Sequence, residues 1–371
     1  MNNERKLRIL ILNWRYLGHP KSGGAEFWTR RVSEELIARG HQVTVFTSCV
    51  KGLPGAEVID GVNVIRRGGQ LTVYWWARKL VRKRSQEFDF ILDEVNTRPF
   101  FAHRHSKVPS RAMFHQIAGD VWRFETPTLI ALVGRHLLEP IWIRRFKKHD
   151  VLVLSQSTAD SLKNWGVKTL KVVHPGVDQL IHTPRTKPKE PTICFLGRLV
   201  PSKRPLDVIN AFKLVQTEFQ DARLIMIGDG PLRSQIRQIA PNSVTVTGKI
   251  SDSDRNAVIS SSHVLVATSI REGWGMNVTE AAELGVPSIG YDVPGLRDSI
   301  AATGGMLVCE TPSSLANALI EFFSSEKRPV ARKLARTWGD VAAELEEIML
   351  QDVNLASITQ MSLGGNNSTY P

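Results

Sequence analysis

The sequence predicts an α/β protein of about two domains, each built around a parallel sheet. The chain has 371 residues, which is too long for one ordinary hydrophobic core, and 42% of them are apolar while 7% are aromatic. Short apolar runs alternate with stretches of helical composition along most of its length. This alternation is typical of parallel strands that are joined by helical crossovers.

Both halves of the chain follow the same plan of strands and intervening helices. In the first half, an apolar strand is followed by a glycine-containing loop and by a helix that ends at Gly40. The strands expected there are residues 7–12, 43–46, 62–65, 90–92, 112–114, 151–154 and 171–173. Those expected in the second half are residues 192–196, 224–227, 244–246, 264–267, 288–289 and 306–308.

Residues 184–191 separate the halves, because proline and charge are frequent there and apolar residues are absent, as in a linker. We therefore expect an N-terminal domain over residues 1–183 and a C-terminal domain over residues 192–335. Residues 336–350 have apolar residues on one helical face and are expected to dock on another part of the protein. The polar residues 351–371 show no clear period and are expected to be mostly disordered.

The composition limits the class of protein further. The formal net charge of +12 favours anionic partners, whether nucleic acid, acidic lipid or a phosphate-bearing substrate. No apolar run reaches the roughly 18 to 20 residues that span a bilayer, and the polar N-terminus lacks the apolar region of a signal peptide, so a cytoplasmic location is expected. Cys49, Cys194 and Cys309 lie far apart in strand-like runs, which predicts buried thiols.

Two acidic residues, Glu272 and Glu280, lie on either side of a glycine-rich turn and the start of a predicted helix. Gly273 and Gly275 allow the backbone to approach a ligand with its N–H groups exposed, and the helix start favours phosphate. The carboxylates then remain free to accept hydrogen bonds from hydroxyl groups of a sugar or a ribose. The alternative is an ordinary helix cap with two solvated acids.

Other candidate residues follow strands, where open parallel sheets bind their ligands. Arg198 and Lys203 lie on one strand-exit loop and are suited to a diphosphate, the arginine through its planar fork and the lysine as a point charge. The alternative is a pair of solvated cations. His115 ends another strand and is a candidate hydrogen-bond donor. Gly23 and Gly24 suit the approach of a phosphate or an acceptor hydroxyl, but they lack the spacing of a dinucleotide site.

Together these motifs resemble the retaining glycosyltransferases of the GT-B architecture, in family four. They occur in the order expected for that family: Gly23-Gly24-Ala25-Glu26, His115, His174-Pro175-Gly176-Val177-Asp178, Gly197-Arg198 with Lys203, Gly228-Asp229-Gly230-Pro231, and the pair Glu272 and Glu280. The resemblance covers roughly residues 7–350. It implies two Rossmann-like domains that face each other across a central cleft, with a C-terminal helix that crosses back to the first domain.

The resemblance also implies a role for each site residue. Glu272 would hold hydroxyl groups of the donor sugar and Glu280 the ribose. The implied donor-binding residues are Arg198, Lys203, Glu272, Gly273, Trp274, Gly275, Met276, Asn277 and Glu280. The implied catalytic residues are His115, Glu272, Arg198 and Lys203, while Gly23 and Gly24 would line the acceptor side.

The implied reaction moves a hexose from a nucleotide-diphosphate sugar to an acceptor hydroxyl with retention of configuration. No cofactor and no metal ion are expected, and the acceptor is expected to be a membrane lipid or a glycan precursor of the cell envelope. A sugar-nucleotide epimerase of the same architecture and a basic nucleic-acid-binding protein are the alternatives. The order of Arg198, Lys203 and the acidic pair favours the transferase, and no nucleic-acid partner is expected because no binding motif accompanies the basic residues.

Two basic segments of the first half also contain aromatic residues. Residues 74–84 combine two tryptophans with five cations, and residues 141–148 repeat the mixture. This composition suits the interface of an anionic membrane, so peripheral contact with the inner face of the cell membrane is predicted. The alternatives are aromatic residues packed inward beside solvated cations, or a cationic surface for nucleic acid.

Overall fold

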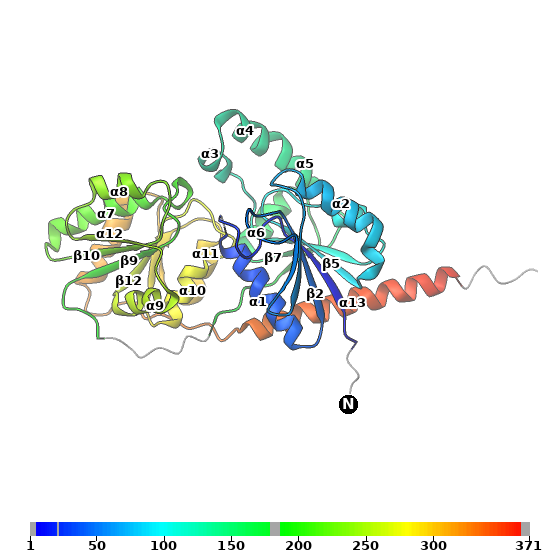
Figure 1. The fold of residues 1–371 in the computed structure, drawn as a ribbon. Coiled ribbons are helices and arrows are strands. Elements are labelled where there is room, and N and C mark those ends of the chain that lie inside the picture. Colours follow the sequence, from blue (N-terminus) through cyan, green and yellow to red (C-terminus); the bar gives the residue numbers. More distant parts are fainter. Residues whose placement is uncertain (1–4, 21, 179–185, 365–371) are drawn as a thin grey trace, which may run out of the picture.

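The computed structural model describes residues 5–20, 22–178 and 186–364, and the surroundings of side chains as far as residue 359. These residues form two α/β domains, each with its own sheet (Figure 1). Of the strands expected from the sequence, every one is present, with bounds that differ by a few residues at most. The two sheets are separated between residues 172 and 192, the interval that contains the predicted linker.

The first domain contains an eight-stranded sheet in the order β3-β4-β2-β1-β5-β6-β7-β8. Its neighbouring strands are parallel, apart from the antiparallel pair β3 and β4 at one edge. The strands are β1 (Arg8–Leu12), β2 (Gln42–Thr47), β3 (Ala56–Ile59), β4 (Val62–Arg66), β5 (Phe90–Val95), β6 (Ser110–Phe114), β7 (Val151–Val153) and β8 (Leu170–Val172).

Strand β3 was not predicted, although a hairpin signal for it is present in the sequence. Asp60 and Gly61 join β3 to β4, and both have positive φ, at 48° and 81°. An Asp-Gly pair in this conformation is the preferred two-residue turn of a β-hairpin. The strand itself is half exposed at the sheet edge, so its apolar pattern is weak.

The helices of the first domain cover both faces of its sheet, and one group extends beyond it. They are α1 (Gly24–Ala38), α2 (Val73–Arg84), α3 (Val121–Glu125), α4 (Thr128–Val133), α5 (Glu139–Arg144) and α6 (Gln156–Asn164). Helices α4 and α5 are joined by a π-helical turn at Gly134–Leu138, and with α3 they form a projection above the domain (Figure 1). Helices α3 and α4 have almost no buried residues and so lack the apolar stripe of an ordinary helix, which is why they were not predicted.

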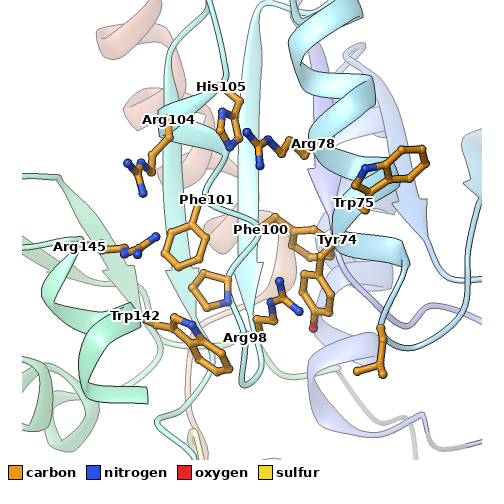
Figure 2. A pocket seen from close by; sticks show the side chains of 12 residues that line it. Tyr74, Trp75, Arg78, Arg98, Phe100, Phe101, Arg104, His105, Trp142 and Arg145 are labelled. Atoms are coloured by element: carbon orange, nitrogen blue, oxygen red, sulfur yellow. The ribbon is translucent and has the colours of Figure 1, made fainter. Parts of the chain in front are cut away.

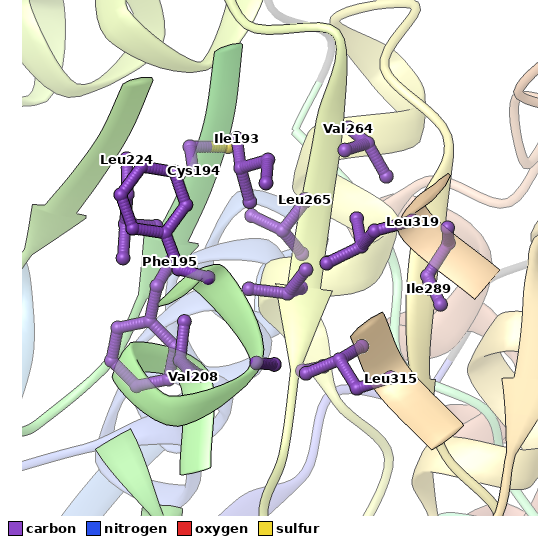
Figure 3. Packing of buried hydrophobic residues seen from close by; sticks show 14 of the residues in the cluster. Ile193, Cys194, Phe195, Val208, Leu224, Val264, Leu265, Ile289, Leu315 and Leu319 are labelled. Carbon is purple, nitrogen blue, oxygen red and sulfur yellow. The ribbon is translucent and has the colours of Figure 1, made fainter. Parts of the chain in front are cut away.

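The second domain contains a fully parallel six-stranded sheet in the order β11-β10-β9-β12-β13-β14. Its strands are β9 (Thr192–Leu196), β10 (Arg223–Ile227), β11 (Val244–Gly248), β12 (Val264–Ala267), β13 (Ser288–Tyr291) and β14 (Met306–Val308). Its helices are α7 (Pro205–Glu218), α8 (Arg233–Ile239), α9 (Asp252–Ser261), α10 (Met276–Glu283), α11 (Leu296–Thr303) and α12 (Pro312–Ser324). Ile193, Leu265 and Leu319 belong to its buried core (Figure 3).

The strand order reverses direction at β1/β5 in the first sheet and at β9/β12 in the second. At such a switch point the loops after the two central strands diverge, which leaves room for a ligand beyond their carboxyl ends. The loops after β1, β9 and β12 carry candidate residues from the sequence. The topology therefore directs the candidate site to the place where the two domains meet.

The last helix, α13 (Trp338–Gly364), returns from the second domain and packs under the first (Figure 1). Trp338, Val341 and Leu345 are buried in the core of the first domain, as the predicted crossover helix requires. The predicted end at residue 350 is wrong, because the buried face continues to Val353 and Asp352 binds Arg111 at 2.6 Å. Residues 351–364 are therefore helical rather than disordered, and the rest of the predicted tail lies outside the described residues.

Two further features bear on the sequence predictions. Cys194 is buried as expected, but Cys49 and Cys309 are exposed because they lie just past the ends of β2 and β14. Over the part of the chain that the structure describes, no helix combines the length and the apolar character needed to cross a bilayer.

Candidate active site

The acidic and basic candidates from the sequence meet at the strand ends of the second domain. Lys203, at the end of a 3₁₀ turn after β9, forms an ion pair with Glu272, which lies on the loop after β12. Ser269 Oγ donates to Glu272 Oε1 at 2.6 Å. The two loops are tied together by Thr268 Oγ1, which donates to the Lys203 carbonyl at 2.8 Å. Lys203 and Ser269 thus hold the carboxylate of Glu272 through Oε1.

The turn after Glu272 depends on glycine at two positions. A Cβ atom on Gly273 would lie 2.2 Å from the carbonyl oxygen of His115, so this turn packs directly on the first domain. Gly275 has a φ of 102° and precedes the first residue of α10, a conformation that side chains disfavour. Between them Trp274 is buried, with its ring centroid 4.6 Å from that of His174.

The start of α10 is open to an anion. The side chain of Asn277 donates to the Leu196 carbonyl at 3.0 Å, which fixes the helix start against the end of β9. Within the described chain, the backbone N–H groups of Met276 and Asn277 have no hydrogen-bond acceptor. Free N–H groups at the positive end of a helix dipole form a ready site for phosphate.

Glu280 lies one turn into α10 and has a different environment from Glu272. Burial raises the pKa of its carboxyl group to about 7; Arg255 opposes the shift, and Asp178 and Asp252 add to it. No described residue donates a hydrogen bond to this carboxylate. Glu280 is half-buried and presents acceptor atoms that protein groups leave unused, which is what a pair of ligand hydroxyl groups requires.

On the first domain, His115 directly follows β6 and is only 3% exposed. Its Nε2 lies 3.1 Å from Glu94 Oε2, and the same oxygen accepts hydrogen bonds from Asn13 and Thr29 at 2.7 and 2.6 Å. Among the described residues, His115 Nδ1 and Glu94 Oε1 are buried without a partner. An orphaned buried polar atom calls for a functional explanation, because leaving it unpaired is costly.

Glu94 was missed by the sequence analysis, which read residues 90–92 only as a strand. The signal was the acidic pair Asp93-Glu94 in an otherwise apolar stretch. Asp93 has a structural task, since it accepts backbone hydrogen bonds from Phe100 and Ala102, both at 3.0 Å. Glu94 positions His115, so it is a candidate positioning residue.

The loop with Gly23 and Gly24 reaches the second domain. A Cβ atom on Gly24 would lie 3.0 Å from the terminal methyl carbon of Met276, at the start of α10. The Gly23 N–H donates to Glu26 at 2.6 Å, and Glu26 in turn binds Arg15. The two glycine-containing loops therefore meet across the domain interface.

Arg198 has a partner from the first domain. Its guanidinium lies 3.6 Å from the carboxylate of Glu125, at the end of α3, and Ser202 Oγ donates to the same carboxylate at 2.7 Å. The Arg198 side chain is still 42% exposed. The surface around Arg198 and Ser202 thus binds an anionic group of the protein itself, the carboxylate of Glu125.

The glycines of the remaining motifs allow backbone segments to pack closely. A Cβ atom on Gly228 would lie 1.9 Å from the Gly197 carbonyl oxygen, and one on Gly230 would lie 2.4 Å from that of Leu199. These glycines allow the loops after β9 and β10 to pack closely. Gly176 has the same role against α13, where its Cβ would lie 2.5 Å from the Trp338 nitrogen.

One Asp-x-Asp sequence, a spacing that can hold a metal ion, occurs at the start of α9. Ser251 caps this helix by accepting the Asp254 N–H at 3.1 Å, and its hydroxyl donates to the Asp254 side chain at 2.7 Å. Asp252 forms an ion pair with Arg255 at 2.9 Å. Both acids thus have local partners at a helix start, where acidic residues are favourable.

Comparison with known proteins places this geometry in a family. Residues 22–179 match the model of Glycosyltransferase Family 4, and residues 178–340 match that of Glycosyl transferases group 1. A GDP-mannose-dependent alpha-mannosyltransferase of Mycolicibacterium smegmatis is 26% identical over 376 residues, which cover 91% of this chain and 96% of that protein.

A second relative and a solved structure agree with this assignment. The GDP-mannose-dependent alpha-(1-6)-phosphatidylinositol dimannoside mannosyltransferase of Mycobacterium tuberculosis is 27% identical over 360 residues, covering 88% of this chain and 92% of that protein. The fold matches that of a sucrose-phosphate synthase from Thermosynechococcus elongatus, with a TM-score of 0.69 at 18% identity, covering 98% of this chain and 99% of that one. The chain therefore belongs to the group 1 glycosyltransferases of family 4 type, and its fold is GT-B.

Proposed function

We propose that the protein is a retaining glycosyltransferase that moves a hexose from a nucleotide-diphosphate sugar to an acceptor hydroxyl group without a metal ion. The observation that supports this most directly is the arrangement around α10. The helix start has free N–H groups, Lys203 and Glu272 lie on the loops beside it, and the unpaired carboxylate of Glu280 lies one turn further along.

In this proposal, each group binds a different part of the donor. The diphosphate binds at the start of α10, where Lys203 and Arg198 supply positive charge in place of a metal ion. The position of Glu125 beside Arg198 supports this, because a carboxylate occupies an anion-accepting spot. Glu280 accepts hydrogen bonds from the ribose hydroxyl groups, and Glu272 from those of the sugar.

The partners of Glu272 support a mechanism without a covalent intermediate. Its carboxylate is held by Lys203 and Ser269, so it is arranged to orient hydroxyl groups rather than to attack carbon. The acceptor oxygen forms a bond to the anomeric carbon on the face from which the diphosphate leaves, as the bond from that carbon to the phosphate oxygen breaks. The departing phosphate oxygen takes the acceptor proton, and the cations stabilise its charge.

The relatives suggest the donor to test first. Both curated relatives described above are named as GDP-mannose-dependent mannosyltransferases, and one is named for a phosphatidylinositol glycolipid. We accordingly propose GDP-mannose as the donor and a membrane lipid or a glycan precursor of the cell envelope as the acceptor.

The test is incubation of the purified protein with radiolabelled sugar nucleotides and a membrane lipid extract, followed by separation of the products. GDP-mannose should label a lipid, and Lys203→Ala and Glu272→Ala should abolish the transfer while the fold is retained. Lys213→Ala is the control, because this lysine is exposed on α7 of the same domain. Unchanged turnover in either site variant would show that the site is wrongly assigned.

Two further measurements test the stereochemistry and the metal independence. The one-bond carbon–proton coupling at the anomeric carbon should indicate the same configuration in the product as in the donor sugar, and an inverted product would refute retention. Turnover should persist in EDTA; loss in EDTA that Mg²⁺ restores would refute metal independence. Thermal stabilisation by oligonucleotides but by no nucleotide or sugar nucleotide would favour nucleic-acid binding instead.

We also propose that the first domain contacts an anionic membrane from the cytoplasmic side. Helices α4 and α5 with their π-helical turn expose large apolar side chains, of which Leu129 is 79% and Ile130 56% exposed. Trp75 on α2 is 58% exposed, and the last turn of α2 consists of three cations. Exposed apolar residues beside basic ones fit the interface of an anionic bilayer, where the apolar groups insert and the cations meet the headgroups.

Liposome flotation measures this contact. The protein should float with vesicles that contain phosphatidylglycerol and not with pure phosphatidylcholine, and Leu129→Glu combined with Ile130→Glu should reduce the floating fraction. Val330→Glu is the matched control, because Val330 is 84% exposed but belongs to the second domain. If the Leu129→Glu/Ile130→Glu variant floats as well as Val330→Glu, α4 does not contact the membrane. If the wild type does not float, the protein does not bind these vesicles and the membrane proposal is wrong.

A further inference from the structure

A second site lies in the first domain, away from the residues around α10. It is a pocket of about 410 Å³ between the start of α2, the segment after β5 and the end of α5 (Figure 2). None of the residues that line it belongs to the candidate active site. Its volume is in the range of pockets that bind small molecules.

The pocket collects positive charge without a counter-charge from the protein. Arg78, Arg98, Arg104 and Arg145 all line it, and no acidic residue does. Within the described chain none of the four has a carboxylate partner, whereas Arg111 on the same domain binds Asp352. All four residues are exposed, so solvent screens their repulsion, but their guanidinium groups face one space and match the oxygen geometry of phosphate.

The titration of a nearby group reflects this positive potential. His105 also lines the pocket, between Arg104 and the side chain of Arg78 (Figure 2). Burial lowers the pKa of His105, and the charges of Arg78, Arg82 and Arg104 lower it further. The electrostatic potential at His105 is therefore positive, as expected in a pocket that binds an anion.

Aromatic side chains form the rest of the wall. The guanidinium of Arg98 lies 4.4 Å from the ring centroid of Tyr74, and that of Arg145 lies 5.3 Å from that of Phe101. Trp142 closes the side opposite α2 (Figure 2). The rings hold the guanidinium groups by cation–π contact and offer apolar surface to whatever lies beside the anion.

We propose that this pocket binds a phosphate group that is attached to a ring or another apolar group, at a site separate from the donor site. Two sources share this chemistry: the headgroup of a phospholipid and a soluble phosphate ester. Binding at this pocket requires neither the sugar nucleotide nor transfer, so it can be tested without the function proposed above.

The experiment is calorimetric titration of the full chain with phenyl phosphate, with inorganic phosphate, and with benzyl alcohol as the neutral control. Phenyl phosphate should bind more tightly than inorganic phosphate, and benzyl alcohol should not bind. Arg98→Gln combined with Arg145→Gln should weaken phenyl phosphate at least about tenfold, since two charge-assisted hydrogen bonds are lost. Arg98→Lys combined with Arg145→Lys should recover part of the affinity, because the charge remains without the fork.

The controls separate this site from the donor site and from misfolding. Arg237→Gln removes an exposed arginine from the second domain and should leave binding unchanged. GDP binding by the pocket variants should equal that of the wild type, which shows that they are folded. The proposal fails if phenyl phosphate does not bind, if GDP displaces it, or if Lys203→Ala abolishes its binding while the pocket variants do not.

Vesicles of phosphatidylglycerol distinguish the two sources. If the Gln variants lose affinity for both these vesicles and phenyl phosphate, the ligand is a phospholipid headgroup. If they lose phenyl phosphate alone and bind the vesicles as the wild type does, the ligand is a soluble phosphate ester. If the variants lose only vesicle binding, Arg98 and Arg145 contact the bilayer surface, and the proposal of a phosphate-binding pocket is wrong.

Discussion

Replacing Glu280 by glutamine is expected to stabilise the protein and to weaken donor binding at the same time. Burial raises the pKa of this carboxyl group from 4.5 to about 7, so the folded protein keeps a proton that the unfolded chain releases. The free energy of unfolding therefore falls as the pH rises from 4.5 through 7. Glutamine has nearly the same shape and carries no charge, so it removes this cost.

The size of the effect follows from the shift. Each unit of pKa difference corresponds to about 1.4 kcal/mol, so the raised pKa of Glu280 lowers the free energy of unfolding by about 3 kcal/mol at pH 8, where the folded carboxyl group is ionised, and by about 1 kcal/mol at pH 5, where it stays protonated. Glu280→Gln should raise the free energy of unfolding by these amounts. The affinity for a sugar nucleotide should move the other way, because charge-assisted hydrogen bonds to the ribose are lost, which amounts to about tenfold or more.

Urea unfolding followed by far-ultraviolet circular dichroism, at pH 5 and at pH 8, measures the stability. Glu218→Gln is the control, since Glu218 is exposed on α7 and should show no gain at either pH. Affinity for GDP-mannose, measured from pH 6 to pH 8, should tighten with pH in the wild type and stay flat in Glu280→Gln. A gain in stability that is equal at both pH values, or unchanged affinity, would refute the role assigned to Glu280.

Two further substitutions test the turn before α10 and the packing of α13. Gly275→Ala should abolish donor binding and lower the free energy of unfolding by more than Gly285→Ala does. Both glycines have positive φ, but of the two only Gly275 would bring its Cβ close to another atom, Ser299 Oγ at 2.8 Å. Equal losses of stability in urea unfolding would contradict this. Leu345→Ala should cost about 2–5 kcal/mol because Leu345 is fully buried in the first-domain core, whereas Leu355→Ala, at 64% exposure on the same helix, should be nearly neutral. A small effect at Leu345 would mean that α13 contributes little to that core.

The strands, and the position of the candidate residues at strand ends, were predictable because their signals are local. Apolar runs identify buried parallel strands, and Gly273 and Gly275 between a strand and a helix indicate a turn whose backbone a ligand can approach. Glu272 and Lys203 could be paired because both follow central strands of the same sheet, where loops converge.

The elements that escaped prediction depend on tertiary contacts. Glu94 lies within a strand and gains its importance only because β6 brings His115 beside it. The end of α13 is helical because Val353 and Asp352 reach the first domain, which a polar composition does not indicate. The positive pocket likewise joins α2 and α5, whose arginines are far apart in the sequence.

The path of α13 makes the second domain an insertion in the first. The core of the first domain begins at Leu7 and is completed by Val341 to Val353, so a ribosome must release almost the entire chain before that core can close. The two connections between the domains meet at one point, where the Val177 N–H donates to the Arg336 carbonyl at 3.0 Å. Hinges are formed by a few residues of such connections, so we expect the domains to move relative to each other about this hydrogen-bonded pair.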